Sequence, residues 1–516
     1  MLNKVKTVTL DGMEGVLVEV ETDISNNLPY FDIIGMTKTT GREAAQRVKR
    51  AIINSGFEYP KGKITVNLSP AYINKRGSHY DLGIAMGVLL ANGNMTCSVE
   101  NVLFIGELSL GGEILPSRAV LPMIMQVLEN KDSDIKEIIL AKENCAECYL
   151  MTKETDIKLI PADNLKSVIR HLHGEKLNEY KGKLIYHEEH AGLDFADVKG
   201  QLLAKEAIII AVAGNHNLLM IGPPGSGKTM LARRISTVLP KMSLEEQIET
   251  TKIYSYAGRL TNQRPIISER PFRHLTSNIT SSSLTGGGNI CMPGEVSFAH
   301  NGVLFWDEML ETPSKVLEQL RVPLSEKKIH IVRNNKHIVF PSNFILIGAS
   351  NPCKCGFLGD PQQRCTCTQT EINNYRNKLS GPMADRIDMC IEVCRINYKE
   401  LESCDDTIKS LSSRDMRERI TIVKEIQKER FKYHNFKSNG DIDNKYIMEI
   451  CELDTAGKTF MESLYEKNNL SPRRYHKILK IARTIADLEQ KRTISTENLA
   501  TAFHYTRFLS ERGKAE

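Results

Sequence analysis

The segment GPPGSGKT combines residue types that bind phosphate groups. It consists of Gly222, Pro223, Pro224, Gly225, Ser226, Gly227, Lys228 and Thr229. Its glycines let consecutive backbone N–H groups converge on phosphate oxygens, while Lys228 can span the β- and γ-phosphates and Thr229 can ligate Mg²⁺. The apolar run LLMI precedes it and the helix-compatible MLARRISTVL follows, a context that separates a P-loop from a Gly-rich turn that only caps a helix. The sequence therefore predicts a site for ATP and Mg²⁺.

Two further runs supply groups that hydrolysis needs. GVLFWDE places Asp307 and Glu308 after an apolar strand, where Asp307 can hold Mg²⁺ through water and Glu308 can polarise the attacking water. NFILIGASN ends at Asn351, whose amide can orient that water. The alternatives are a solvated strand end for the acidic pair and a turn-closing residue for Asn351.

A third pattern is a cysteine cluster in a loop that contains Gly, Pro and Asp. Cys353, Cys355, Cys365 and Cys367 form CxC-x9-CxC, so four thiolates could reach one metal ion. Structural Zn²⁺ is the expected occupant, and reduced, unliganded thiols are the alternative. Cys145 and Cys148 have helical spacing without a second pair, which favours ordinary packing.

The elements around these residues alternate between strand and helix. From about residue 192, the expected order is helix 205–213, strand 217–222, the Gly-rich turn and its helix, strand 302–306, helix 314–323 and strand 343–349. This order predicts a doubly wound α/β core with a parallel sheet over 192–396, with ligand chemistry at the carboxyl ends of the strands. Residues 397–516 show helical periodicity and should form an all-helical region.

The first 170 residues form a separate α/β domain by the same criterion. Strands are expected at 16–24, 63–68, 102–110 and 137–141, and helices at 42–55, 82–91 and 119–129. Residues 171–191 are polar, contain four His and lack a sustained apolar period, so they are expected to form a linker.

Composition sets broad limits on function. The 516 residues, 41% of them apolar, suffice for about three packed domains. The net charge of +5 permits an anionic partner but does not identify one. The start lacks an apolar stretch of signal-peptide type, and the longest run of apolar residues and Gly, 82–91, is about half a membrane span. A cytoplasmic protein with no membrane partner is expected.

The motifs together resemble a family. The P-loop, the DE pair, the strand-terminal Asn and GPMADRID at 381–388 resemble AAA+ ATPases. RPFR from Arg270, PGEVSFAHNGVLFWDE from Pro293 and NPCKCG from Asn351 resemble their magnesium-chelatase-like ComM/YifB branch over nearly the whole chain. The resemblance implies a homo-hexamer in which Arg386 is the arginine finger toward the neighbouring subunit and Arg473 the sensor-2 arginine of a helical lid.

These two arginine roles leave alternatives open. Arg386 could form an ion pair with Asp385 or Asp388 instead, and the adjacent Arg474 competes for the role of Arg473.

In the first domain, GELSLGGEILPSRAVL from Gly106 and SHYDLGIAMGVLL from Ser78 resemble the proteolytic domain of Lon proteases, an S5 domain 2-like fold. The resemblance places Asp81 where that family has its nucleophilic Ser and Leu121 where it has its catalytic Lys. Because a Ser–Lys dyad needs a hydroxyl and a base, peptidase activity is not expected, although nearby Ser78 could shift into place. The domain is interpreted as an assembly or docking module.

Two segments could contact a polymer threaded through a ring. One is the insertion that contains RPFR and the Gly/Ser/Thr stretch 276–288. The other is the hairpin KIHIVRNNKHIVF, whose tip would present Arg333 and Lys336 to DNA phosphates unless it is merely solvated. The family resemblance implies a DNA branch-migration helicase acting in recombination or natural transformation, with recombination proteins as further partners. The alternative is a chelatase-type ATPase that remodels a protein partner for metal insertion.

Overall fold

The computed structural model describes residues 3–73, 75–130, 134–182, 192–288, 291–333, 336–395 and 411–507. Part of the predicted linker and the predicted start of the last domain, residue 397, lie outside these residues. The chain forms two compact units. The first comprises Met1–His187, Ser243–Ser268 and Val332–Val339, and the second comprises the remaining segments. The sequence was divided into consecutive domains, whereas the structure groups two central segments, Ser243–Ser268 and Val332–Val339, with the first unit.

The first unit contains a mixed seven-stranded sheet, ordered β3-β4-β2-β1-β5-β8-β9. Its strands are β1 (Asn3–Asp11), β2 (Glu14–Ser25), β3 (Phe31–Ile34), β4 (Lys63–Ser69), β5 (Val102–Ile105), β8 (Glu137–Leu140) and β9 (Lys158–Pro161). A small hairpin joins β6 (Glu107–Leu108) to β7 (Ile114–Leu115). The helices are α1 (Lys38–Asn54), α2 (Asp81–Ala91), α3 (Val120–Glu129), α4 (Lys142–Thr152), α5 (Leu165–Leu172) and α8 (Leu244–Tyr256).

Helices cover both faces of this sheet and enclose a separate hydrophobic core on each. Helix α2 is apolar all round because it lies inside one of these cores. Gly87 lets α2 approach β2 closely, since a Cβ there would lie 2.5 Å from Thr22 Oγ1. Cys145 and Cys148 are buried in α4, in agreement with the packing role predicted from their spacing.

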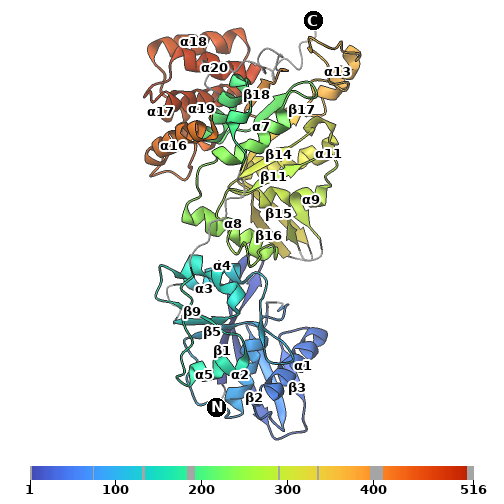
Figure 1. The fold of residues 1–516 in the computed structure, drawn as a ribbon, viewed down its shortest axis with the longest axis vertical. Helices are drawn as coiled ribbons and strands as arrows, with labels where there is room; N and C mark the ends of the chain where they lie inside the picture. The colour runs from blue at the N-terminus through green and yellow to red at the C-terminus, as the bar shows by residue number, and fades with distance from the viewer. Residues whose placement is uncertain are drawn as a thin grey trace. The chain divides into compact units, whose positions relative to one another are not determined.

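The second unit is built on a parallel five-stranded sheet, ordered β11-β14-β17-β10-β18 (Figure 1). Its strands are β10 (Leu218–Ile221), β11 (Phe272–Leu275), β14 (Val303–Trp306), β17 (Ile345–Ser350) and β18 (Met389–Glu392). The prediction of a doubly wound α/β core is confirmed. Strand β17, which ends beside Asn351, lies between the P-loop strand β10 and β14, which carries the acidic pair.

The helices of this core are short except for α6. They are α6 (Leu202–Gly214), α7 (Lys228–Arg234), α9 (Ser281–Thr285), α10 (Glu295–Phe298), α11 (Ser314–Leu317), α12 (Arg321–Glu326), α13 (Gln369–Arg376) and α14 (Gly381–Ala384). Two-stranded sheets form from β12 (Gly286–Gly287) with β13 (Met292–Pro293), and from β15 (Lys328–Arg333) with β16 (Lys336–Pro341). The part of the second hairpin within Val332–Val339 is grouped with the first unit.

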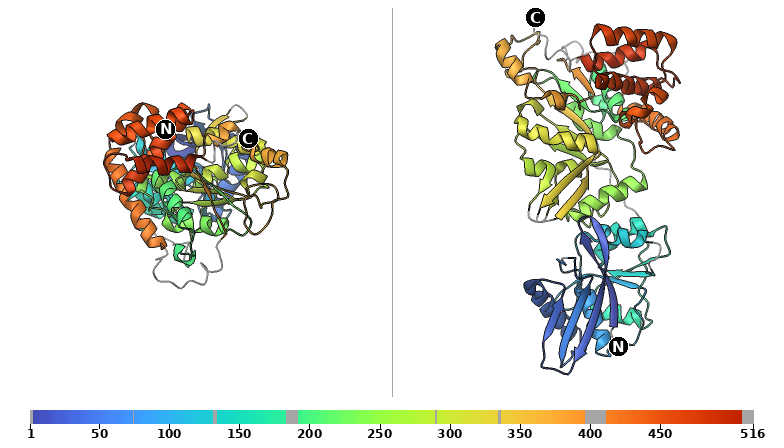
Figure 2. Two further views of the ribbon diagram at one scale, coloured as in Figure 1. Left: turned by 90° about the horizontal axis from the view of Figure 1, so that it is seen from above. Right: turned by 180° about the vertical axis from the view of Figure 1, so that it is seen from behind.

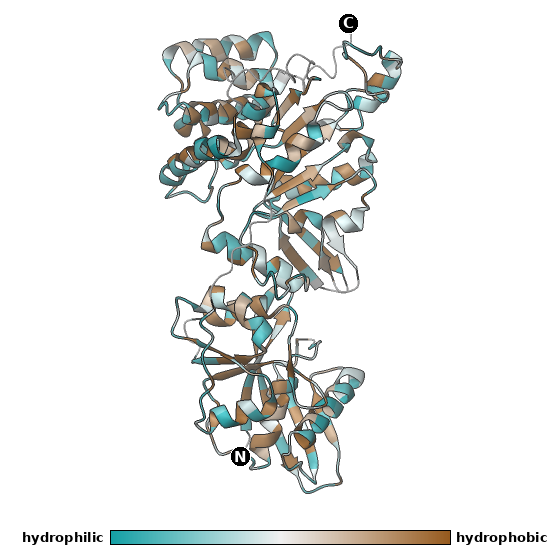
Figure 3. Cartoon of the chain, in the orientation of Figure 1, coloured by the Kyte–Doolittle hydropathy of each residue, from teal (hydrophilic) through white to brown (hydrophobic). Residues whose placement is uncertain are grey.

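The C-terminal region is helical, as predicted. It contains α16 (Ser413–Arg430), α17 (Ile447–Ile450), α18 (Thr455–Lys467), α19 (Pro472–Leu488) and α20 (Thr496–Arg507), which gather into one group in every view (Figure 2). Their apolar faces share one continuous core with α6 and the parallel sheet. The strands of that sheet are accordingly hydrophobic (Figure 3). Across the described ranges, no helix combines the length and apolar character that a membrane span requires.

Candidate functional site

The predicted phosphate-binding loop connects β10 to α7. Gly225 and Gly227 have φ of +78° and +90°, which residues with a Cβ rarely adopt. At Gly222 a Cβ would lie 2.2 Å from the Val393 carbonyl oxygen, so glycine is needed for close packing. The Lys228 ammonium donates to the carbonyls of Gly222, at 2.7 Å, and Pro223, at 2.9 Å. The loop therefore has the backbone conformation and the cationic side chain that binding of a nucleoside triphosphate requires.

Lys228 is easier to deprotonate than an ordinary lysine. Burial lowers its pKa to about 8, although the Asp307 carboxylate acts in the opposite direction. Bound phosphates favour the ammonium form and would raise this pKa again. ATP binding above pH 8 must therefore be accompanied by proton uptake.

We predict that ATP affinity falls about tenfold between pH 7 and pH 9, because Lys228 loses its proton over this range in the free protein. Phosphate has its second pKa near 6, so the nucleotide charge stays constant. Titration calorimetry at pH 9 in two buffers of different ionisation enthalpy should report uptake of about one proton per ATP. Equal affinity at both pH values would contradict the role of Lys228.

The predicted magnesium ligands already contact one another. Thr229 Oγ1 donates to Asp307 Oδ2 at 2.8 Å, which brings together the P-loop hydroxyl and the carboxylate at the end of β14. A hydroxyl beside a carboxylate is the oxygen donor set that Mg²⁺ uses with nucleotide phosphates. These two residues would hold the ion, and its charge would offset that of the β- and γ-phosphates.

Glu308 lies directly beyond Asp307 in an unusual backbone conformation. Its φ is +50°, and its N–H donates to Asp307 Oδ1 at 3.0 Å. This left-handed turn points successive side chains in different directions, so the two carboxylates can take different tasks. Glu308 can act on water while Asp307 faces Thr229.

Two residues near the acidic pair were not predicted as site residues. Ser277 Oγ donates to Glu308 Oε2 at 3.4 Å, and His274 Nε2 lies 4.0 Å from Asp307 Oδ2 while its ring stacks on Phe305. Both reach the site because β11 pairs in parallel with β14. FRHL has no apolar run or alternation strong enough to predict this short edge strand, so the contact could not be predicted from sequence.

Asn351 follows β17 and thus lies between the strands that lead to Lys228 and Glu308. The cysteine loop begins immediately after it and packs on the phosphate-binding loop. A Cβ at Gly356, where φ is +87°, would lie 2.8 Å from Pro224 Cδ and 3.9 Å from Asn351 Cγ. The cysteine loop therefore supports both Pro224 and Asn351.

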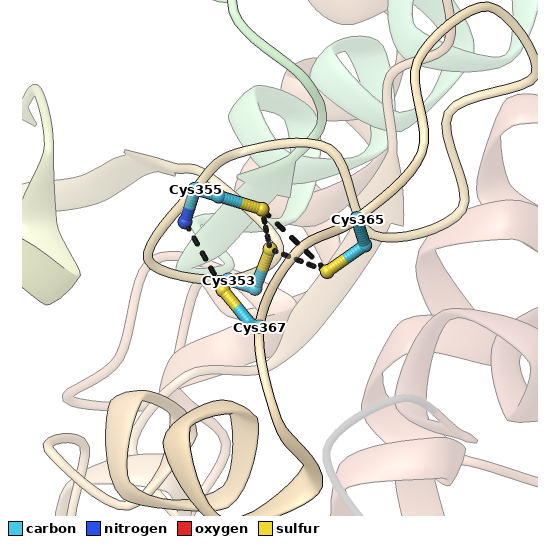
Figure 4. Close-up of side chains that lie close together, drawn as sticks. All are labelled: Cys353, Cys355, Cys365 and Cys367. Atoms are coloured by element: carbon cyan, nitrogen blue, oxygen red, sulfur yellow. Dashed lines mark hydrogen bonds between the residues drawn. The ribbon is translucent and has the colours of Figure 1, made fainter.

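The four predicted cysteine ligands converge (Figure 4). Their Sγ atoms all lie within 4.8 Å of one another, with Cys353–Cys355 at 3.4 Å and Cys353–Cys365 at 3.7 Å. Tetrahedral Zn²⁺ with bonds of about 2.3 Å sets its sulfur ligands about 3.8 Å apart, so the cluster fits this ion. The backbone N–H of Phe357 lowers the pKa of Cys355 to about 5, which favours a thiolate.

Protein purified under reducing conditions is expected to contain about one zinc per chain, and Cys355→Ser should lose most of it. Elemental analysis measures this content. Cys394→Ser is the matched control, because Cys394 is an exposed cysteine outside the cluster. Because the loop supports Pro224 and Asn351, the Cys355 variant should also hydrolyse ATP more slowly. A metal-free, fully active protein would contradict both expectations.

Arg386 lies at the opposite end of the sheet from the phosphate-binding loop. Its carbonyl accepts a hydrogen bond from Asn217 Nδ2 at 2.8 Å, and Asn217 precedes β10, whereas the loop follows that strand. The four residues of β10 span about 13 Å. The Arg386 guanidinium donates to Arg321 O, Ser325 Oγ and Pro382 O rather than to Asp385 or Asp388. Arg386 is therefore remote from the nucleotide site of its own chain.

Arg473 lies next to Arg386. At the start of α19, its Nη1 is 3.7 Å from Asp385 Oδ2, and its side chain is 78% exposed. The competing Arg474 turns inward instead, where its Nη2 donates to Thr506 O at 3.3 Å and its guanidinium lies over the Phe503 ring. Of the two, Arg473 is the arginine available to a ligand, and it shares the surface of Arg386.

The predicted polymer-contacting segments have different surroundings. The guanidinium of Arg270, in RPFR, donates to Pro240 O and Asn301 O, both at 2.8 Å, so it supports the fold of the insertion. Strands β15 and β16 form the predicted hairpin, and Arg333 is exposed at the end of β15. The hairpin tip and the Lys336 side chain lie outside the described residues.

Asp81, which the resemblance to Lon proteases aligns with their nucleophile, forms a buried ion pair with Arg47. The buried Asp81 carboxylate accepts from Arg47 Nε at 2.7 Å and Arg47 Nη2 at 3.1 Å. Burial raises the pKa of Asp81 to about 6, although Arg47 acts to lower it. Ser78 donates its hydroxyl to Glu107, and Leu121 is buried. This arrangement stabilises the packing of α1 against α2.

The parallel sheet, its phosphate-binding loop, the contact between Thr229 and Asp307 and the adjacent Glu308 define a P-loop ATPase of the AAA+ class. Comparison with known proteins shows to which family within this class the chain belongs. The profile "Magnesium chelatase, subunit ChlI" matches residues 194–401, "Subunit ChlI of Mg-chelatase" matches 20–144, and the ChlI C-terminal profile matches 410–506.

Two relatives match over almost their whole length, and a third matches over a smaller part. Competence protein ComM of Haemophilus influenzae is 39% identical over 96% of this chain and 95% of its own. Uncharacterized protein YifB of Escherichia coli is 37% identical over 98% and 97%. The magnesium-chelatase 67 kDa subunit of Chlorobaculum parvum is 24% identical over 31% of this chain and 23% of its own. The chain belongs to the magnesium-chelatase ChlI-like ComM/YifB family, as the sequence motifs indicated, and is an ATPase of that family.

Proposed function

We propose that the protein is a hexameric ring motor that couples ATP hydrolysis to movement on DNA and drives branch migration during recombination of incoming DNA. The similarity over nearly the full length to a protein named competence protein ComM supports a role in the recombination of incoming DNA. Recombination proteins are the partners that this role requires.

The observation that carries the ring is the separation of the cationic groups from the nucleotide site. Arg386 and Arg473 share one surface at the amino ends of the strands, and the phosphate-binding loop lies at the carboxyl ends. A guanidinium at the γ-phosphate offsets the charge that develops in the transition state. If Arg386 or Arg473 supplies that guanidinium, it acts on the nucleotide of a neighbouring subunit, because both lie away from the loop of their own chain.

DNA contact is assigned to the β15–β16 hairpin. Arg333 is exposed there, and six such hairpins in a ring would present positive charge to phosphates without reading bases. Lys336 contributes the same chemistry from the other strand.

The experiment that tests this function measures ATPase stimulation and strand displacement with single-stranded, duplex, forked and four-way DNA at several salt concentrations. Stimulation should be greatest with four-way DNA and should decline as salt rises, because phosphate contacts release counterions. Arg333→Ala should weaken stimulation equally for all sequences and reduce the salt slope by about one.

The second candidate is a chelatase-type ATPase that remodels a protein partner for metal insertion. The ChlI profiles, which together match most of the chain, favour it. An ATPase that none of the four DNA structures stimulates would support this function and oppose the DNA motor.

A further inference from the structure

The backbone that carries Arg386 is held by side chains from two other elements. Lys477, on α19, donates from Nζ to Ile387 O at 2.6 Å and to Asp385 O at 3.1 Å. Asn217 Nδ2 donates to the carbonyl of Arg386 itself at 2.8 Å. Three consecutive carbonyls are thus bound by side chains, in a segment between α14 and β18 where neither helix nor sheet supplies partners.

Lys477 holds this position although it is only partly exposed to water. Burial lowers its pKa, and the nearby carboxylates of Asp388 and Asp385 act in the opposite direction. A partly buried ammonium needs close partners, and the carbonyls on both sides of Arg386 provide them. Asp388 fixes the other side, because its Oδ2 accepts from the backbone N–H of Asn217 at 2.8 Å.

The same helix carries Arg473. The Arg473 guanidinium lies 3.7 Å from Asp385 Oδ2. Lys477, one turn further along α19, donates to the Asp385 carbonyl. A shift of α19 must therefore move both arginines. Arg473 is part of this helix, and Lys477 of the same helix binds the backbone on both sides of Arg386.

We propose that Lys477 is a positioning residue for Arg386 that makes the arginine finger follow the helix α19. The inference rests on the proposed ring function, in which Arg386 acts on the nucleotide of a neighbouring subunit. Lys477 itself contacts no nucleotide. It sets the place of the finger, and loss of its ammonium releases the carbonyls of Asp385 and Ile387.

The test compares Lys477→Ala with the matched variant Lys480→Ala. Lys480 is also a partly buried lysine on α19, but its Nζ donates to Gly440 O at 3.2 Å and not to the finger segment. Lys477→Ala should keep ATP affinity and lower kcat about a hundredfold, because misplacement of a catalytic group by about 1 Å has an effect of this size. Lys480→Ala should hydrolyse ATP at nearly the unchanged rate, and Lys477→Arg, which keeps the charge and donors, should recover most of the activity.

Subunit mixing separates positioning from general support of the fold. Lys477→Ala subunits keep an intact phosphate-binding loop, so Lys228→Ala subunits, which keep an intact finger, should restore ATPase at mixed interfaces. Lys477→Met, which retains the apolar stem, should behave in the same way. Loss of ATP binding, a large fall in melting temperature of both variants, or absence of rescue would overturn the inference. If Arg386→Ala subunits are also not rescued, the proposed ring fails; if they alone are rescued, only the role of Lys477 fails.

Discussion

Glu308→Gln is expected to bind ATP as tightly as the unchanged protein but to hydrolyse it at least about a hundredfold more slowly. The amide keeps the size and hydrogen-bonding length of the side chain, but it cannot take a proton from water. The contact between Thr229 and Asp307 does not involve this side chain, so the magnesium ligands should remain in place. Single-turnover hydrolysis and equilibrium binding of a fluorescent ATP analogue measure the two effects separately.

Lys228→Ala is the contrasting variant. It removes the ammonium that binds the carbonyls of Gly222 and Pro223 in the phosphate-binding loop, and it should abolish detectable ATP binding. Ser277→Ala serves as a milder control, because it removes one 3.4 Å hydrogen bond to Glu308 and leaves the carboxylate. Tight ATP binding by the Lys228 variant, or rapid turnover by Glu308→Gln, would contradict the assignment of this site.

Local sequence predicted which segments meet at the centre of the site, and the roles of their residues stay predictions. GPPGSGKT and the DE pair are short motifs that directly follow the apolar runs of β10 and β14. The cysteines lie in one loop that follows β17. Strand-ends of a parallel sheet meet at one edge, so correct strand assignments place Lys228, Asp307 and Asn351 together. This topology brings Thr229 and Asp307 to the same edge of the sheet, where their side chains form a hydrogen bond.

Contacts made by irregular or short segments could not be predicted in the same way. The approach of Gly356 to Pro224 depends on the path of the cysteine loop, and the contact of Ser277 with Glu308 depends on the edge strand β11. Neither segment has a periodicity from which its position can be read. The three carbonyls around Arg386 also gave no signal, because backbone acceptors are present at every residue and only tertiary structure selects their donors.

The placement of Arg386 and Arg473 leads to the second large effect. Arg386→Ala should lower kcat about a thousandfold, in the range observed when an arginine finger is removed. Its ATP affinity should change little, because the phosphate-binding loop of the same chain lies at the other end of β10. ATPase rates measured over a range of ATP concentrations distinguish a fall in kcat from a rise in KM.

Mixing Arg386→Ala with Lys228→Ala subunits should restore activity that neither variant has alone. An Arg386→Ala subunit contributes the intact loop, its neighbour contributes the intact finger, and random assembly of equal amounts should recover about a quarter of the unchanged rate. Subunits with both substitutions supply neither part, so mixing them with Arg386→Ala should restore nothing. Arg474→Ala should need no rescue, because that side chain packs against α20. If the first mixture stays inactive while both variants assemble, Arg386 does not act across the interface, and its position remote from its own loop would require a purely structural explanation.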